Sequence, residues 1–365
     1  MNYTSRRPRL NMKAEQIHAT KERMNNMAKI YNSITELVGH TPLVEFKRLE
    51  KELGLKGRII GKLEYFNPAG SHKDRIALEI IEAAEKRGEI SPDTTTLVEF
   101  TSGNTGIALA AFAAAKGYKF RIGLQPGVSV ERLKLLEAYN ADIIPVDPED
   151  LAIVFEQGIA AFGAVIDKFV AQTPNGYPTL QLSNPDNVNA HYKHTGPEIW
   201  EDTDGKVDIF VGGVGTGGST HGVSKFLKEQ NPDVETIITQ PHPDSIANSA
   251  VEGASDGGFH GIHPVHDENG FNAMTPENFG PDYADRFEDI TYAETLKAIH
   301  LAGKYEGVFL GASAGASLAV AIKEAKKAEN DGKVIVALLP DNGERYLSED
   351  LQRVRPELED KVTSF

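Results

Sequence analysis

The sequence predicts an α/β fold, because patterns typical of strands and of helices alternate along the chain. Three times, an apolar run that resembles a strand leads through a turn of small or polar residues into a helical pattern. The 365 residues are 40% hydrophobic and 25% charged, which is enough to bury substantial cores in two domains. The strand-like runs are 96–100, 207–211 and 308–310.

Composition excludes several classes of protein. The chain contains no cysteine, so it has no disulfide, no thiolate metal site and no catalytic thiol. Its formal net charge of −15 disfavours nucleic acids and anionic membranes as partners. No run is apolar over the length of a membrane span, and the first residues lack the apolar core of a secretion signal. We therefore expect a cytoplasmic protein, with residues 1–30 as an exposed, partly helical extension.

One lysine, Lys73, lies where a glycine-containing turn opens into a helix. The apolar spacing of Ile76, Ile80 and Ile81 predicts that helix. The positive end of a helix dipole disfavours an ammonium group, which lowers the pKa of the amine and leaves more of it neutral and nucleophilic. Such a lysine suits Schiff-base chemistry. Taken alone, a lysine at this position is more often a solvated side chain on a helix cap.

The loop after the first strand gathers hydroxyl, amide and backbone N–H groups at the start of a helix predicted over 107–115. Its residues are Thr101, Ser102, Gly103, Asn104, Thr105 and Gly106. The unpaired N–H groups of a helix N-terminus favour an anion, so the loop is a candidate site for a carboxylate or a phosphate. The alternative is an ordinary N-cap turn, which Ser and Asn also favour.

A glycine-rich turn, 212–219, follows the second strand. Glycine lets backbone N–H groups approach an anion closely, so this turn is a candidate phosphate site. Gly213, Gly215 and Gly218 also match the dinucleotide fingerprint G-x-G-x-x-G, which requires an acidic residue at the end of the next strand. That strand leads into Gln240 instead. The sequence therefore favours a phosphate monoester over a dinucleotide.

Ser313 follows the third strand-like run, again at the start of a helical pattern, predicted over 318–328. A neutral hydroxyl at a strand end can form a hydrogen bond with a heterocyclic nitrogen. By itself such a serine is more often a helix cap.

Three histidines and two acidic residues crowd the stretch 260–268. Glycine and proline interrupt any helical face there, and the spacing fits no zinc signature. We expect a solvated loop and no metal site.

Further stretches of the chain carry a resemblance to a known family. They are 34–44 (ITELVGHTPLV), 181–185 (QLSNP), 194–202 (HTGPEIWED) and 340–347 (PDNGERYL). With the segments above, and in this order, they resemble the cysteine synthase and cystathionine β-synthase family of fold type II pyridoxal phosphate enzymes. Within that family the similarity is closest to the cysteine synthases (O-acetylserine sulfhydrylases).

The resemblance implies a tryptophan synthase β-like fold of two domains, each a mainly parallel sheet flanked by helices. We place the N-terminal domain at 31–185 and the C-terminal domain at 186–365, and the resemblance allows the segment near 43–65 to cross to the second sheet. The cofactor, pyridoxal 5′-phosphate, is expected in the cleft between the domains. The resemblance also suggests a homodimer and allows a further partner, the C-terminal tail of a serine acetyltransferase.

The roles of individual residues are likewise implied by the resemblance. Lys73 is the catalytic residue, which holds the cofactor and acts as general base. The cofactor ring is expected to contact Asn104 at its hydroxyl and Ser313 at its nitrogen. The phosphate is assigned to Gly215, Thr216, Gly217, Gly218 and Ser219, and the substrate carboxylate to Thr101, Ser102, Gly103, Thr105 and Gln181.

The implied reaction is β-replacement on an activated L-serine, in which O-acetyl-L-serine and sulfide give L-cysteine and acetate through an aminoacrylate intermediate. A cystathionine β-synthase-type reaction with homocysteine, or replacement by another nucleophile such as an amine, is the alternative. Two alternatives come from other classes: an inert cofactor-binding paralogue, disfavoured by the intact Lys73, Asn104 and Ser313, and a dinucleotide-dependent oxidoreductase.

The chain departs from the family pattern in three places. His72 stands before the lysine where relatives usually have an apolar residue, and Ser219 stands where they have threonine. The segment 240–276 lacks the usual Glu-Pro and Gly-Ile-Gly patterns. We therefore expect a reshaped pocket wall.

Overall fold

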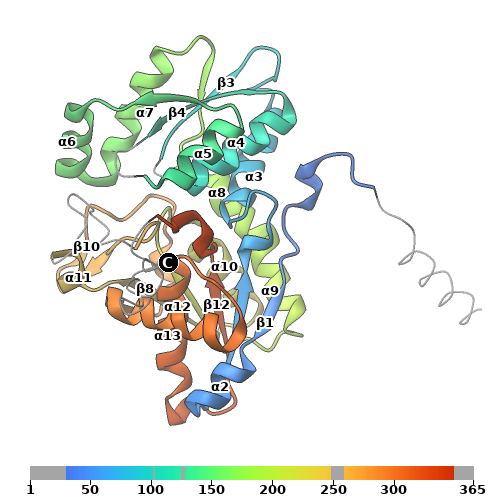
Figure 1. Ribbon diagram of the computed structural model, residues 1–365, viewed down its shortest axis with the longest axis vertical. Helices are drawn as coiled ribbons and strands as arrows, with labels where there is room; N and C mark the ends of the chain where they lie inside the picture. Colours follow the sequence, from blue (N-terminus) through green and yellow to red (C-terminus); the bar gives the residue numbers. More distant parts are fainter. Residues whose placement is uncertain (1–29, 102, 125–127, 248–258, 349–365) are drawn as a thin grey trace, which may run out of the picture.

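The computed structural model describes residues 30–101, 103–124, 128–247 and 259–348. Their strands form a four-stranded sheet, a six-stranded sheet and a two-stranded hairpin. Helices cover both larger sheets, the smaller of which lies in the upper lobe of Figure 1. The predicted α/β class is confirmed. Ser102 and residues 1–29 of the expected extension lie outside the described residues.

The four-stranded sheet is parallel throughout, with the strand order β5-β4-β3-β6. Successive side chains of a strand point to opposite faces, and both faces of this sheet are covered. On β3, Leu97 packs against helices α3 and α4, whereas Val98 and Phe100 pack against α7. The strands are β3 Thr96–Phe100, β4 Lys119–Leu124, β5 Asp142–Pro145 and β6 Gly176–Pro178. The helices are α3 Lys73–Arg87, α4 Asn104–Lys116, α5 Val130–Ala138, α6 Pro148–Gln157, η3 Gly158–Ala160 and α7 Ala161–Ala171.

The six-stranded sheet has the order β1-β2-β12-β7-β8-β11, and only β1 runs antiparallel to its neighbour. Strands β1 and β2 precede the whole four-stranded sheet in the chain but belong to this second sheet. The strands are β1 Leu43–Glu45, β2 Arg58–Leu63, β7 Ile209–Gly213, β8 Glu235–Pro241, β11 Arg286–Ile290 and β12 Val334–Leu339. The hairpin pairs β9 His266–Asp267 with β10 Gly270–Phe271.

Helices flank the six-stranded sheet on both faces. Ile209 and Val211 of β7 share a cluster with α12 and α13, while Phe210 packs with α9 and α10 on the other face. The longer helices are α2 Lys47–Leu53, α8 Pro185–Ala190, α9 Gly196–Asp202, α10 Gly218–Gln230, α11 Pro243–Ala247, α12 Tyr292–Glu306 and α13 Ala312–Ala325. Short turns of helix are η1 Ile34–Leu37, η2 Glu64–Phe66, η4 His191–Thr195, η5 Pro281–Tyr283, η6 Ala328–Asn330 and η7 Gly343–Tyr346.

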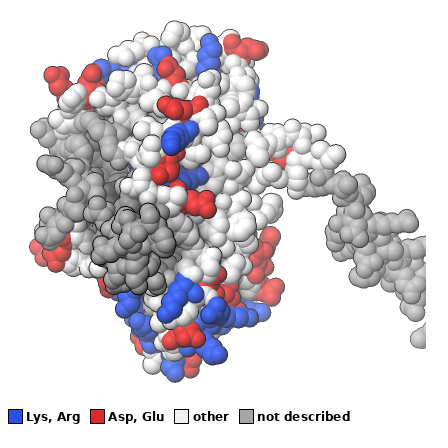
Figure 2. Space-filling model, viewed as in Figure 1, with Lys and Arg blue, Asp and Glu red and all other residues white. Residues whose placement is uncertain are grey.

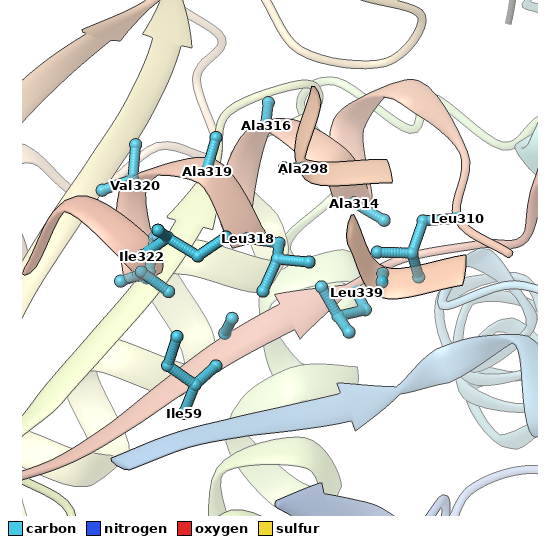
Figure 3. Close-up of a cluster of buried hydrophobic side chains, with 14 of the residues drawn as sticks. Ile59, Ala298, Leu310, Ala314, Ala316, Leu318, Ala319, Val320, Ile322 and Leu339 are labelled. Atoms are coloured by element: carbon cyan, nitrogen blue, oxygen red, sulfur yellow. The ribbon is translucent and has the colours of Figure 1, made fainter. Parts of the chain in front are cut away.

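Helix α13 is buried along almost its whole length. Its side chains Ala314 and Leu318 lie in one cluster with Ile59 of β2 and Leu339 of β12 (Figure 3). Small residues let α12 approach α13 closely: a Cβ added at Gly315 would lie 2.5 Å from Cγ1 of Ile299. This packing fixes the start of α13, and therefore Ser313, above the sheet.

Some local predictions are wrong. The run 308–310 forms no strand, since only Leu310 makes an isolated bridge, to Asn342, and the backbone before it turns through the left-handed Gly307. Helix α13 begins at Ala312, six residues before the predicted start, because its alanines favour a helix and its small side chains fit the crowded core. In contrast, β3 has the predicted limits. No helix in the described ranges has both the length and the apolarity to cross a membrane.

Candidate active site

A cavity of about 180 Å³ is lined by residues that follow strands of both larger sheets. Loops after the carboxyl ends of β3, β7 and β12 contribute to it, which is where ligands bind in open α/β sheets. The structure brings ten of the predicted site residues together on its lining: Lys73, Thr101, Gly103, Asn104, Thr105, Gln181, Gly215, Thr216, Ser219 and Ser313. Gly217 belongs to the adjoining loop, Gly218 is the first residue of α10, and Ser102 lies outside the described residues.

Charge distinguishes this cavity from the outer surface. Among the described residues, its lining includes Lys73, Arg132 and three histidines but no Asp or Glu. By contrast, acidic and basic side chains are intermixed on the face shown in Figure 2. In a chain with a net charge of −15, such a lining favours an anionic ligand.

Lys73 is the first residue of α3, and its Nζ lies 2.8 Å from Nε2 of His72. Burial lowers the pKa of the Lys73 amine to about 8, against the opposing effect of the Asp341 carboxylate. At pH 7 roughly a tenth of such an amine is neutral. The pKa is lowered, as the sequence predicts, and desolvation is the main cause.

The loop that starts at Thr101 meets Gln181 across the cavity. Thr105 donates a hydrogen bond from its hydroxyl to Oε1 of Gln181. Beneath them, the buried Glu99 accepts hydrogen bonds from the backbone N–H of Gln181 and from the Thr179 hydroxyl. Burial raises the pKa of Glu99 to about 7, although these bonds oppose the shift. The side chain of Gln181 is therefore held in place before any substrate arrives.

Asn104 is fixed on both sides of its amide. Its Nδ2 donates to Oδ2 of Asp341 at 2.6 Å, and its Oδ1 accepts from Nη1 of Arg345 at 2.6 Å. The hydroxyl of Tyr346 also donates to Oδ2 of Asp341. This cluster holds the start of α4 against the segment that follows β12.

The glycine-rich loop between β7 and α10 requires its glycines. Gly217 has φ +82°, and a Cβ there would lie 2.6 Å from the backbone nitrogen of Phe279. A Cβ at Gly215 would lie 2.2 Å from the carbonyl oxygen of Gly261. The first turn of the 13-residue helix α10 leaves backbone N–H groups without helical partners. These N–H groups, with the hydroxyl groups of Thr216 and Ser219, fit a phosphate monoester.

Ser313 is the second residue of α13 and is buried on the cavity lining. Its carbonyl accepts a hydrogen bond from Ser317. Its position fits a short, neutral hydrogen-bonding group facing the ligand.

The histidine-rich segment is not the solvated loop that we expect from its sequence. His260 and His263 line the cavity, and the ring of His266 stacks on Phe287 with centroids 4.5 Å apart. The buried side chains of Ile262 and Val265 hold the segment against the sheet. Among the described residues, no group of three or more potential metal ligands comes together.

Sequence reasoning missed several residues of the site. Glu99, Asp341 and Arg345 support predicted residues, while Arg132 lies with its guanidinium 5.1 Å from the ring centroid of Tyr346. Asp341 is the second residue after the strand-like run 334–339, so the rule that ligands gather at carboxyl ends of strands could have found it. Glu99 carries no such signal, because its role depends on a contact with Gln181 that only the fold creates.

Comparison with known proteins agrees with this geometry. The family model described as "Pyridoxal-phosphate dependent enzyme" matches residues 34–341. Cysteine synthase A of Salmonella typhi is 40% identical over 330 residues, which cover 88% of this chain and 95% of that relative.

Solved structures give the same result. A cysteine synthase of Entamoeba histolytica matches with a TM-score of 0.75 and 34% identity, over 98% of this chain and 96% of that one. An O-ureido-L-serine synthase matches with a TM-score of 0.75 and 32% identity, over 92% of this chain and 100% of that one. Because the family model covers most of the chain and the relatives are similar along almost their whole length, this protein belongs to the pyridoxal-phosphate dependent enzymes.

Proposed function

We propose that the protein catalyses β-replacement on O-acetyl-L-serine with sulfide, giving L-cysteine and acetate. One observation carries this proposal: a single cavity presents the Lys73 amine together with a phosphate-type loop at Gly215 and a carboxylate-type loop at Thr101. The names of its relatives, cysteine synthase A among them, support the same reaction.

The residues present fit pyridoxal phosphate. The glycine loop 215–219 would hold its phosphate, Lys73 would bind it covalently, and Asn104 and Ser313 would contact its ring hydroxyl and ring nitrogen. When bound, this cofactor supplies a ring system that withdraws electrons from the Cα atom of the substrate. A serine hydroxyl, unlike a carboxylate, places no negative charge beside the ring nitrogen.

The substrate carboxylate is assigned to the loop opposite, with Thr101, Ser102, Gly103 and Thr105, and to Gln181. The bond from Thr105 to Gln181 and the support from Glu99 preorganise these groups. Preorganised polar groups orient a ligand without further ordering cost.

Lys73 carries the proton in this reaction. Its neutral amine takes the proton from Cα, breaking the C–H bond, and the acetate group leaves Cβ with its electron pair. The sulfur then bonds to Cβ, and Lys73 returns the proton to Cα. The pKa of about 8 keeps part of this amine in the neutral form that the first proton transfer requires.

A second candidate is replacement by homocysteine, which gives cystathionine. The cavity lining favours it: His260, His263 and Arg132 line the cavity, without an acidic side chain among the described lining residues. A nucleophile that carries its own carboxylate would suit such a wall.

One experiment separates these functions. The purified, cofactor-loaded protein is given O-acetyl-L-serine with sulfide, with homocysteine or with neither, and the amino-acid products and acetate are quantified. Formation of cysteine at a higher kcat/KM than cystathionine supports the proposal. The reverse ratio establishes the second candidate, and acetate release with neither product contradicts both.

We also propose, from the family resemblance, that the protein is a homodimer in the cytoplasm and that its domains are 31–185 and 186–365. A serine acetyltransferase tail is a further proposed partner. Sedimentation of the purified protein, alone and with a peptide of that tail, tests the two assembly proposals.

A further inference from the structure

The residue before the catalytic lysine is a buried histidine. His72 is 8% exposed, and its Nε2 lies 2.8 Å from Nζ of Lys73. Both side chains line the cavity. No role in the reaction as proposed above requires this imidazole, so the contact needs its own explanation.

The ring of His72 is fixed by packing. Its backbone N–H donates to the carbonyl of Pro340 at 2.9 Å, which ties the residue to the segment after β12. Its ring lies 5.9 Å from that of His191, whose Nδ1 is paired with the Thr195 hydroxyl at 2.9 Å. Within the described residues, Nδ1 of His72 is buried and has no hydrogen-bond partner. The bond to Lys73 is therefore what engages this imidazole.

The charges around the pair decide which atom donates. Burial lowers the pKa of His72 well below its usual value, and Lys73, His191 and Arg75 lower it further, so the imidazole is neutral. With a pKa of about 8, set by burial against the charge of Asp341, the free lysine is mostly an ammonium at neutral pH. The ammonium has only donors, so Nε2 of His72 is the acceptor and the proton of the ring lies on Nδ1.

We propose that His72 is a positioning residue for Lys73: whenever the lysine is not covalently engaged, Nε2 of His72 accepts a hydrogen bond from Nζ and holds the amine facing the cavity. This inference rests on the proposed function of Lys73 as anchor and base. When Lys73 takes the proton from Cα, the new N–H bond stays on Nζ and the imidazole stays neutral. The acceptor stabilises the ammonium until the proton returns to Cα.

The first test measures the pKa of Lys73 in cofactor-free protein, from the pH dependence of the rate at which added pyridoxal phosphate is captured. His72→Leu removes the acceptor and should lower this pKa by about one unit, since a hydrogen bond to a charged group is worth roughly that much. His72→Gln, which retains an acceptor on a side chain of similar reach, should restore most of the shift. His300→Leu, on α12 away from the cavity lining, is the matched control and should leave the profile unchanged.

The second test needs no variant. In cofactor-free protein with ¹⁵N-labelled histidine, the signal of His72 Nε2 should be that of an unprotonated nitrogen at pH 7. An Nε2–H tautomer, or a His72→Leu profile that matches the wild type, would overturn the inference. If Lys73→Ala still bound the cofactor covalently and converted O-acetyl-L-serine, the proposed function itself would fail. If the inference about His72 failed, the result expected for Lys73→Ala would not change, so the two failures can be told apart.

Discussion

Two regions at the start of helix α3 surround a basic side chain in opposite ways. Arg75 donates to Glu64 and Glu198 at 2.7 Å each, and Lys62 of β2 adds a second cation, 2.8 Å from Glu198. Two residues before Arg75, the partner of Lys73 is a neutral imidazole.

The difference shows what makes a lysine reactive. Burial alone would raise the pKa of Glu198, but hydrogen bonds and charges from Arg75 and Lys62 lower it overall, so this cluster stays ionised and inert. Lys73 is only partly buried and has no carboxylate at hydrogen-bond distance among the described residues, and desolvation lowers its pKa to about 8. The buried ion network holds β2, α3 and α9 together, and the underpaired lysine beside it remains available for chemistry.

Removing the side chain of Lys73, the reactive lysine, should have the largest effect. Lys73→Ala is expected to lower kcat by at least about 10³-fold and to abolish the visible absorption of the bound cofactor, because the covalent anchor and the base are lost together. Far-ultraviolet circular dichroism should stay unchanged. Lys86→Ala, at an exposed position of the same helix, is the control. Retention of the absorption band and of near-normal activity would show that another residue is the anchor.

Removing the ion-paired Arg75 should lower the stability of the fold and leave the chemical step of the reaction unchanged. Arg75→Met leaves Glu64 and Glu198 buried without their main cation, which should cost about 3–5 kcal/mol in the free energy of unfolding. Arg87→Met removes an exposed arginine of the same helix, paired with Glu89 and Asp186, and should cost less than about 1 kcal/mol. Urea denaturation of both variants checks this. Equal losses would mean that the buried network contributes no more than a surface ion pair.

A carboxylate placed in the glycine loop should weaken cofactor binding at the phosphate end of the site. Gly217→Asp forces a side chain into a left-handed position that lies against Phe279 and sets a negative charge beside the phosphate. Affinity for pyridoxal phosphate should fall by about 100-fold or more, measured by titration of cofactor-free protein. Gly332→Asp has a similar positive φ but open space around it, so it controls for backbone strain alone. If the two variants bound the cofactor equally, the loop would not contact the phosphate.

Lys62 has a carboxylate partner, and giving Lys73 one as well should have the smallest effect on the fold. It should clearly change the pH dependence of cofactor capture. His72→Glu places a carboxylate beside Nζ, which favours the ammonium and should raise the lysine pKa from about 8 by roughly one unit or more. Since only the neutral amine reacts, the rate of cofactor capture should then need a higher pH to reach its plateau. A profile that stayed in place would mean that the neighbour at position 72 does not control the amine.

Sequence reasoning predicted the parts of this comparison that are local. The limits of β3, the Thr101 loop, the glycine turn and Lys73 all follow from periodicity and turn composition within short windows. The ion network could not be predicted in this way, because Glu198 is 123 residues from Arg75 in the chain and the two meet only in the folded protein. The prediction of a solvated loop at His260 is wrong because it also depends on a long-range contact. The polar residues of this segment give no sign that Ile262 packs against Gly213.

The place of β2 also determines when the enzyme can become active during synthesis. This strand lies between β1 and β12, and its Ile59 pairs with Ile335, near the far end of the described chain. A nascent chain therefore leaves β2 without this neighbour until β12 has been synthesised, which is the kind of delayed, long-range pairing that slows folding. Lys73 follows β2 closely and Asn104 is tied to Asp341 after β12. Cofactor capture should consequently follow the synthesis of β12 and Asp341, and fragments that end before Val334 should remain colourless.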